Sequence, residues 1–163
     1  MSEPLRRVGI GIAEEPEKVV ASANAVSGPF ETVCYCSPGT VEKKTVQEHV
    51  HVLEHADPAR ALVDDLASGR IDAAVRGTLP SNATLKALKT AMGVDHLERI
   101  ALLETVNGKK FLLSPVGVDE GWTVAEKLEL IKKGRIIARK FGLPSKVGVL
   151  SGGRPWGLWA SYS

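Results

Sequence analysis

Three apolar segments of strand length in this chain each lead directly into small or hydroxyl-bearing residues. The segments are 71–77, 111–113 and 147–150, and they are followed by 81–84, Ser114-Pro115 and 151–154. In open α/β sheets, ligands bind outside the carboxyl ends of the strands. Backbone N–H groups that are free at loop–helix junctions attract anions there. The pattern therefore predicts a site for a small anionic ligand, either phosphorylated or carboxylated.

Strand-like and helix-like segments alternate along the 163 residues. Strands are expected at 7–13, 30–36, 49–55, 71–77, 99–106, 109–113 and 146–150. Helices are expected at 14–26, from Pro58 to a stop at Gly69, from Ser81 to Met92, and from Thr123 to Phe141. This alternation predicts an α/β fold with helices on both faces of a mostly parallel sheet. Asn107-Gly108 is typical of a hairpin turn, which adds an antiparallel element and makes the sheet mixed.

Two of the expected helices have a clear inward face. The residues expected to be buried are Ala61, Leu62 and Leu66 in one helix, and Leu128, Ile131, Ile137 and Phe141 in the longest one. Pro58 suits the first helical position, and Thr123 stands three residues before Glu126, which is the spacing of a capping box. These features predict where the helices start and which side they bury.

Composition excludes several classes of protein. Hydrophobic residues make up 44% of the chain, which is ordinary for a soluble domain, and the net charge of +2 argues against nucleic acid as a partner. No apolar run approaches the roughly 20 residues that span a bilayer, and the first seven residues lack the core of a signal peptide. Cys34 and Cys36 share one face of an expected strand, so we expect free thiols in a reducing cytoplasm.

The strongest candidate for an anion site follows the strand at 71–77. It consists of Arg76, Gly77, Ser81, Asn82 and Thr84. A charged residue at the end of an apolar strand is costly without a partner. The hydroxyl and amide groups lie around a helix N-terminus, where the helix dipole favours an anion. The structural alternative is that Ser81 only caps the helix and that Arg76 pairs with a carboxylate such as Asp72.

A second candidate follows the strand at 146–150. Ser151, Gly152, Gly153 and Arg154 combine a flexible backbone, which can form a concave nest of N–H groups, with a guanidinium that grips phosphate. The alternative is an ordinary turn.

Other features favour structural explanations. Gly9 and Gly11 lie within a strand and lack the third glycine of a dinucleotide loop, so close packing is the better explanation. His49, His51 and His55 have no acidic or cysteine partner placed to complete a metal site, so no metal is expected. The basic side chains of the long helix are expected to form a solvated face.

A resemblance to the phosphate acetyl- and butyryltransferases rests on ordered blocks between residues 69 and 151. Asp72-Ala73-Ala74-Val75-Arg76-Gly77, then Ser81 to Thr84, resembles that family's D-A-x-V-x-G segment. The blocks around Ser114, from Thr123 to Gly142 and from Lys146 to Ser151 resemble that family's next strand, its long helix and the strand that follows this helix. Within that superfamily the chain is most similar to the methanogenesis marker protein 4 family, the methyltransferase-related MtxX proteins of methanogenic archaea.

The resemblance implies a three-layer αβα fold like that of the isocitrate and isopropylmalate dehydrogenases. We expect one α/β domain over 1–163 that lacks the C-terminal part of the family fold. Coenzyme A or an acyl phosphate is the implied ligand, and Ser114 joins the candidate ligand residues, although it stands where the acyltransferases usually have an aspartate. No catalytic residue is identified, because the family's catalytic aspartate would come after Ser151.

Two functions therefore remain open at the level of the sequence. The first is a transferase, either methyltransferase-related or phosphate acyltransferase-like. The second is a non-catalytic accessory protein in methyl transfer, with a methyltransferase, a corrinoid protein or a second copy of the chain as its partner.

Overall fold

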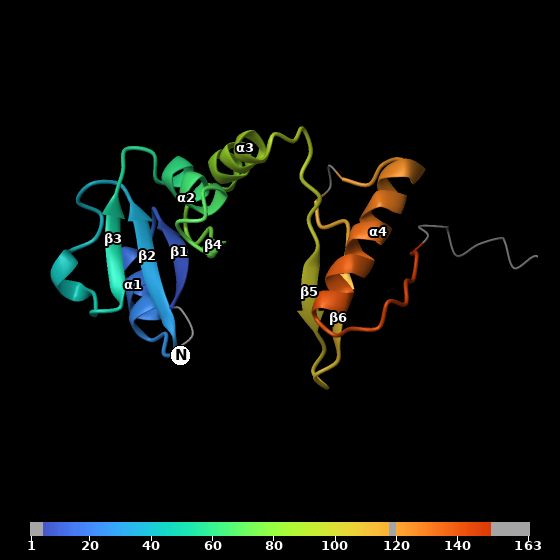
Figure 1. The fold of residues 1–163 in the computed structure, drawn as a ribbon, viewed down its shortest axis with the longest axis horizontal. Coiled ribbons are helices and arrows are strands. Elements are labelled where there is room, and N and C mark those ends of the chain that lie inside the picture. The colour runs from blue at the N-terminus through green and yellow to red at the C-terminus, as the bar shows by residue number, and fades with distance from the viewer. Residues whose placement is uncertain (1–4, 118–119, 151–163) are drawn as a thin grey trace, which may run out of the picture. The chain divides into compact units, whose positions relative to one another are not determined.

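The computed structural model describes residues 5–117 and 120–150, and the chain divides into two compact units, Met1–Leu97 and Glu98–Ser163 (Figure 1). The first unit holds a parallel sheet with the strand order β3-β2-β1-β4. Its strands are β1 (Arg6–Ile12), β2 (Phe30–Cys36), β3 (Val50–Glu54) and β4 (Ala73–Val75). Its helices are α1 (Pro16–Asn24), α2 (Pro58–Ala67) and α3 (Ser81–Met92), with a short 3-10 turn, η1, at Lys43–Thr45. The α/β fold with a mostly parallel sheet is confirmed.

Helices pack on both faces of this sheet because the central strand β2 carries buried residues on both sides, Cys34 and Cys36 on one and Val33 and Tyr35 on the other. One core cluster joins α1 to the sheet through Val20, Ala23, Ile12, Cys34, Cys36, Val41 and Val50. The other joins α2 to the opposite face through Ala59, Leu62, Val33, Tyr35, Ile71 and Leu79. Leu62 is buried as expected, and Ala61 and Leu66 pack at the edge of the second cluster. Parallel strands covered on both faces read as continuous apolar runs.

The glycines of β1 are there for packing. A Cβ atom at Gly9 would lie 2.6 Å from Cδ1 of both Ile71 and Leu62. At Gly11 it would lie 2.0 Å from Cδ1 of Leu79 and 2.6 Å from the carbonyl oxygen of Arg76. These positions admit no side chain, and the packing explanation is confirmed.

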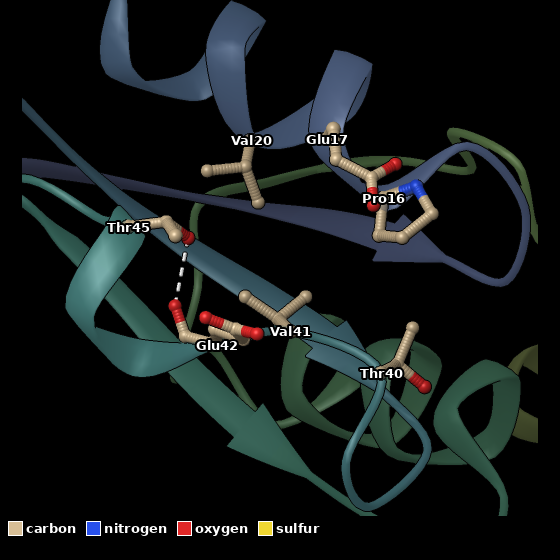
Figure 2. A pocket seen from close by; sticks show the side chains of 7 residues that line it. All are labelled: Pro16, Glu17, Val20, Thr40, Val41, Glu42 and Thr45. Carbon is tan, nitrogen blue, oxygen red and sulfur yellow. Dashed lines mark hydrogen bonds between the residues drawn. The ribbon is translucent and has the colours of Figure 1, made fainter.

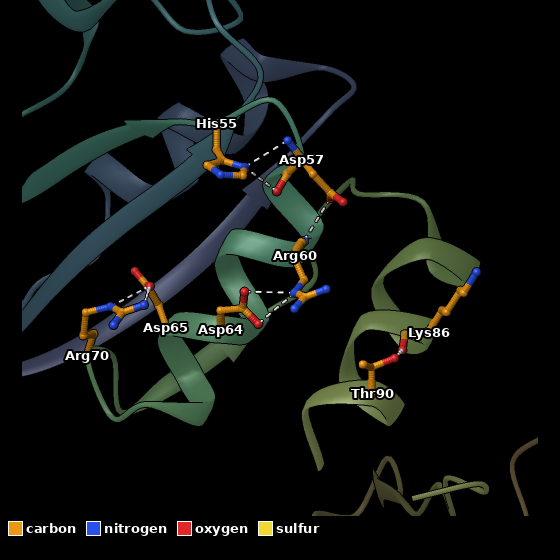
Figure 3. Close-up of polar contacts among 8 residues, drawn as sticks. All are labelled: His55, Asp57, Arg60, Asp64, Asp65, Arg70, Lys86 and Thr90. Carbon is orange, nitrogen blue, oxygen red and sulfur yellow. Dashed lines mark hydrogen bonds and ion pairs between the residues drawn. The ribbon is translucent and has the colours of Figure 1, made fainter. Parts of the chain in front are cut away.

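Polar groups fix both ends of α2 (Figure 3). The Asp57 carboxylate accepts a hydrogen bond from the Arg60 backbone N–H at 3.0 Å and caps the helix, which starts at Pro58 as expected. At the other end, Arg70 Nε donates to Asp65 at 2.7 Å. Asp65 also accepts a 2.7 Å hydrogen bond from the buried Tyr35 hydroxyl, so this carboxylate ties α2 to β2.

Cys34 and Cys36 are buried in the first sheet and are free thiols, as expected. Burial raises the pKa of the Cys34 thiol to about 11, and the neighbouring Cys36 adds to the shift. Both thiols are therefore protonated at neutral pH, and they are unreactive while they stay buried in the folded sheet.

The second unit contains a hairpin and the longest helix. β5 (Ala101–Glu104) and β6 (Lys110–Leu113) pair antiparallel around Asn107-Gly108, as expected. α4 (Val124–Lys140) starts with the predicted capping box between Thr123 and Glu126. The hairpin forms a two-stranded sheet of its own, so the expectation of one mixed sheet is wrong for the described residues.

Two further expectations for the second unit are wrong. Residues 146–150 have no strand geometry, and Val149 and Leu150 are 69% and 91% exposed. A strand needs a hydrogen-bonded neighbour, and the described residues provide none here. In α4, Leu130 and Ala138 are buried and the expected Ile131 and Ile137 are half-buried, whereas Leu128 and Phe141 are exposed. The apolar residues of α4 itself lie on several of its sides, so their spacing along the sequence did not identify the packed face.

Among the described residues, no helix is long and apolar enough to cross a membrane.

Candidate functional site

The candidate site lies at the carboxyl ends of β1 and β4, which are neighbours in the sheet. The loop after β4, residues 76–80, is here called the Arg76 loop. Its Thr78 hydroxyl accepts hydrogen bonds from the backbone N–H groups of Ala13 (2.9 Å) and Glu14 (3.0 Å). The Thr78 N–H in turn donates to the Gly11 carbonyl at 3.1 Å. These bonds hold the loop after β4 against the loop after β1, and the sequence analysis did not single out Thr78.

Arg76 is exposed, and its guanidinium donates to the Leu79 carbonyl within the same loop. The suggested pairing with Asp72 is wrong, because Asp72 accepts from the Arg7 backbone N–H at 2.8 Å and pairs with Arg6 at 3.4 Å. Among the described residues, no carboxylate lies within ion-pair distance of Arg76. No carboxylate of the residues that the structure describes therefore neutralises its positive charge.

The expectation that Arg76 stands at the end of a buried strand is wrong. All three residues of β4 are exposed, because this strand is short and pairs only with β1 among the described residues. A charge at its end pays little desolvation cost. Arg76 remains a candidate because no carboxylate in the described part of the chain pairs with it.

The N-terminus of α3 directly follows the Arg76 loop. Its N-cap position is Pro80, and no side chain caps it, so the expected cap by Ser81 is wrong. Ser81 and Asn82 are exposed in the first turn, where backbone N–H groups have no partner within the helix. Thr84 is buried, and its hydroxyl donates to the Pro80 carbonyl at 3.0 Å. An exposed, uncapped helix start next to a guanidinium can hold an anion.

Five of the predicted ligand residues thus come together in one loop and helix start. They are Arg76, Gly77, Ser81, Asn82 and Thr84. Ser151, Gly152, Gly153 and Arg154 lie outside the described residues. Ser114 lies in the second unit, where its hydroxyl donates to the Arg99 carbonyl at 3.1 Å.

Arg99 and Glu120 form an ion pair next to Ser114 that sequence reasoning missed. The Glu120 carboxylate is 6% exposed; it accepts from the Arg99 backbone N–H at 3.2 Å and pairs with the Arg99 guanidinium. Burial raises the pKa of Glu120, but the hydrogen bonds and charge of Arg99 outweigh it and hold the pKa below its usual range. The two residues are 21 positions apart, and no motif in the sequence joins them.

The three clustered histidines have separate partners. His49 Nε2 lies 3.3 Å from the Ala23 carbonyl, and His51 Nε2 lies 4.0 Å from a Glu31 carboxylate oxygen. His55 Nδ1 accepts from the Asp57 backbone N–H at 2.9 Å. In the part of the chain that the structure describes, no three metal-ligating side chains come together.

The fold of the chain is similar to that of a phosphotransacylase of known structure. A branched-chain phosphotransacylase from Enterococcus faecalis has a similar structure, with a TM-score of 0.68 and 20% identity, over 85% of this chain and 52% of that one. At this level of identity the similarity concerns the fold alone. No family model matches the chain.

The sequence relatives are more specific. The chain is 39% identical over 150 residues to the "Putative methyltransferase mtx subunit X" of Methanosarcina barkeri, which covers 91% of this chain and 55% of the relative. The protein of the same name from Methanosarcina mazei is also 39% identical, with 53% of its length covered. An uncharacterized methyltransferase of Methanocaldococcus jannaschii is 35% identical over 117 residues, 69% of this chain and 47% of that protein. The predicted resemblance to the MtxX family is confirmed, and the chain spans about half the length of these relatives.

Proposed function

We propose that the chain is a methyltransferase-related protein of the MtxX type that binds a small anionic ligand at the Arg76 loop. The observation that carries this proposal is the exposed guanidinium without a carboxylate partner in the described part of the chain, beside the uncapped start of α3. A phosphate or carboxylate would be held there by charge-assisted hydrogen bonds. Ser81 and Asn82 would add hydroxyl and amide contacts.

The phosphotransacylase-like fold supports coenzyme A or an acyl phosphate as the ligand class. Ser114 and residues 151–154 stay candidate ligand residues of the second unit in this proposal. A three-layer αβα architecture of the isocitrate dehydrogenase type is what we propose for the fold. The two free thiols fit a cytoplasmic setting.

Thermal stability with and without ligands tests the binding site. Inorganic phosphate, acetyl phosphate, coenzyme A and S-adenosylmethionine would be compared by their effect on the melting temperature. A ligand present at 100 times its Kd adds about 2.7 kcal/mol of stability, which is a clear shift. We expect Arg76→Ala to abolish the shift. Arg135→Ala is the matched control, because Arg135 is also exposed and has no ion pair among the described residues.

Two results would count against the anion site. One is an unchanged melting temperature with all four compounds. The other is an equal ligand shift in wild type and Arg76→Ala. Stabilisation by S-adenosylmethionine alone would support methyl transfer over acyl transfer.

A non-catalytic accessory role is the second candidate. Large apolar side chains are exposed in the second unit, among them Trp122 at 76% and Phe141 at 59%. Exposed aromatic side chains suit protein interfaces. The partner would be a methyltransferase, a corrinoid protein or a second copy of the chain. Exchange of acetyl groups between acetyl-CoA and phosphate separates the candidates, since only an acyltransferase would catalyse it, and sedimentation would detect a dimer.

A further inference from the structure

A pocket of about 260 Å³ lies between α1 and the loop that follows β2 (Figure 2). Three of its lining residues come from α1, and four come from the loop and η1. They are Pro16, Glu17 and Val20, and Thr40, Val41, Glu42 and Thr45. None of them belongs to the Arg76 loop. The first turn of α1 follows the carboxyl end of β1, so the pocket lies at the edge of the sheet where α/β proteins bind ligands.

The charge of this pocket is negative. Of the described residues, Glu17 and Glu42 are the ionisable ones that line it, and no lysine or arginine among them does. Within the described residues, the Glu17 carboxylate takes part in no hydrogen bond or ion pair. Glu42 pairs with the exposed Lys44, whose Nζ lies 2.9 Å from the carboxylate. The pocket therefore offers carboxylates to a cation, one of them without a partner.

The rest of the lining is suited to a short hydrocarbon chain. Val20 and Val41 are buried and face the pocket from opposite sides (Figure 2). Thr40 and Thr45 supply hydroxyl groups, and Thr45 already donates to the Glu42 carbonyl at 2.7 Å, which leaves its oxygen as an acceptor. The seven described residues that line the pocket include no aromatic side chain, and proteins recognise quaternary ammonium groups with aromatic cages.

We infer that this pocket binds a primary alkylammonium group. Its N–H donors would bond to Glu17 and Glu42, and its methylene groups would lie against Val20 and Val41. The group could come from a free aliphatic amine or from the lysine side chain of a partner protein, which present the same chemistry. This site is separate from the anion site and does not depend on it.

Lys44 shows how such a group competes for the pocket. The primary ammonium group of Lys44 forms an ion pair with the Glu42 carboxylate, although the Lys44 side chain is 82% exposed. An incoming ammonium group must displace it at this carboxylate. Removing the Lys44 charge should therefore strengthen binding, while removing the Glu17 charge should weaken it.

Titration of the full chain with n-butylammonium chloride, followed by NMR of the valine methyl groups, tests the inference. We expect saturable shifts at Val20 and Val41. Glu17→Gln should raise the Kd about tenfold, and Lys44→Gln should lower it about threefold. Glu14→Gln is the matched control, because Glu14 precedes α1 without lining the pocket. Should Glu17→Gln fail to fold in a melting experiment, Glu42→Gln replaces it.

Two further probes identify the ligand more closely. Tetramethylammonium should bind at least about tenfold more weakly than butylammonium, because it has no N–H donors. Nα-acetyl-lysine methylamide binds as well as or better than butylammonium if the source is a lysine side chain, and more weakly if the source is a free amine. The inference would be overturned by an absence of saturable shifts up to about 10 mM. Equal Kd values for wild type and Glu17→Gln, or for the two ammonium ions, would also overturn it. An unchanged Kd in Lys44→Gln would remove Glu42 from the binding site.

Discussion

Replacing Gly11 by alanine tests how the sheet positions the Arg76 loop. The new Cβ atom would lie 2.0 Å from Cδ1 of Leu79, where ordinary contact begins at 3.4 Å, so Leu79 would have to move by about 1.4 Å. Leu79 is 2% exposed and has little room. The Arg76 carbonyl, at 2.6 Å, is backbone and cannot rotate away. Overpacking of this kind costs about 1–3 kcal/mol, and we expect a loss near about 3 kcal/mol because both neighbours are confined.

Urea denaturation followed by circular dichroism measures this loss. Gly39→Ala is the matched control, since a Cβ atom there meets nothing within 4 Å and only its φ of +76° opposes alanine. That strain alone should cost about 1–2 kcal/mol. The movement forced on the Arg76 loop should also weaken ligand stabilisation in Gly11→Ala but not in Gly39→Ala. A loss below about 1 kcal/mol in Gly11→Ala would refute the argument that β1 and the Arg76 loop are packed without space between them.

Three other substitutions probe single polar contacts. Tyr35→Phe removes the hydrogen bond to Asp65 and should lower the free energy of unfolding by about 2 kcal/mol at pH 7 in urea titrations. The Asp65 pKa is held below its ordinary 3.8. Burial raises this pKa, but the hydrogen bonds from Tyr35 and Arg70 lower it by more than burial raises it. Its stabilisation is therefore present above the unfolded pKa and lost as the pH falls, so the difference between Tyr35→Phe and wild type should shrink toward pH 3; a constant difference would contradict this. Asp57→Ala removes the cap of α2 and should cost about 1 kcal/mol, measured by chemical denaturation; no change would mean that the cap contributes nothing. Thr123→Ala breaks the capping box and should reduce the helical circular dichroism signal on mild heating, whereas an unchanged melting curve would exclude this role.

The first unit could be predicted closely from the sequence because its signals are local. β2 spans Phe30–Cys36 as expected, and α2 starts at Pro58 behind the Asp57 cap. When strands and helices alternate within 97 residues, few arrangements other than a helix-covered parallel sheet can bury the apolar strands on both faces. The hairpin also followed from two residues, Asn107-Gly108.

The second unit was harder because its structure depends on distant partners. Residues 146–150 have the composition of a strand, but a strand forms only beside a neighbour, which composition does not reveal. The packed face of α4 contains Leu130 and Ala138, and apolar residues on its other sides obscured it. For the candidate site, the sequence located the Arg76 loop but mistook the exposed β4 for a buried strand. The role of Thr78 depends on two loops that lie 64 residues apart and come together only in the folded sheet.

Because both thiols are buried, their rate of chemical labelling can report on the opening of the first unit. Cys34 and Cys36 are the two cysteines of the chain, and both are fully enclosed between the sheet and α1. A thiol reagent can reach them only when α1 lifts or the strands separate, and the raised pKa of Cys34 slows its attack further. The labelling rate therefore reports how often the first unit opens, while the second unit, which has no cysteine, contributes nothing to it. A ligand that closes the loops at the carboxyl ends of β1 and β4 would slow this labelling, even if it produced no change in absorbance or fluorescence.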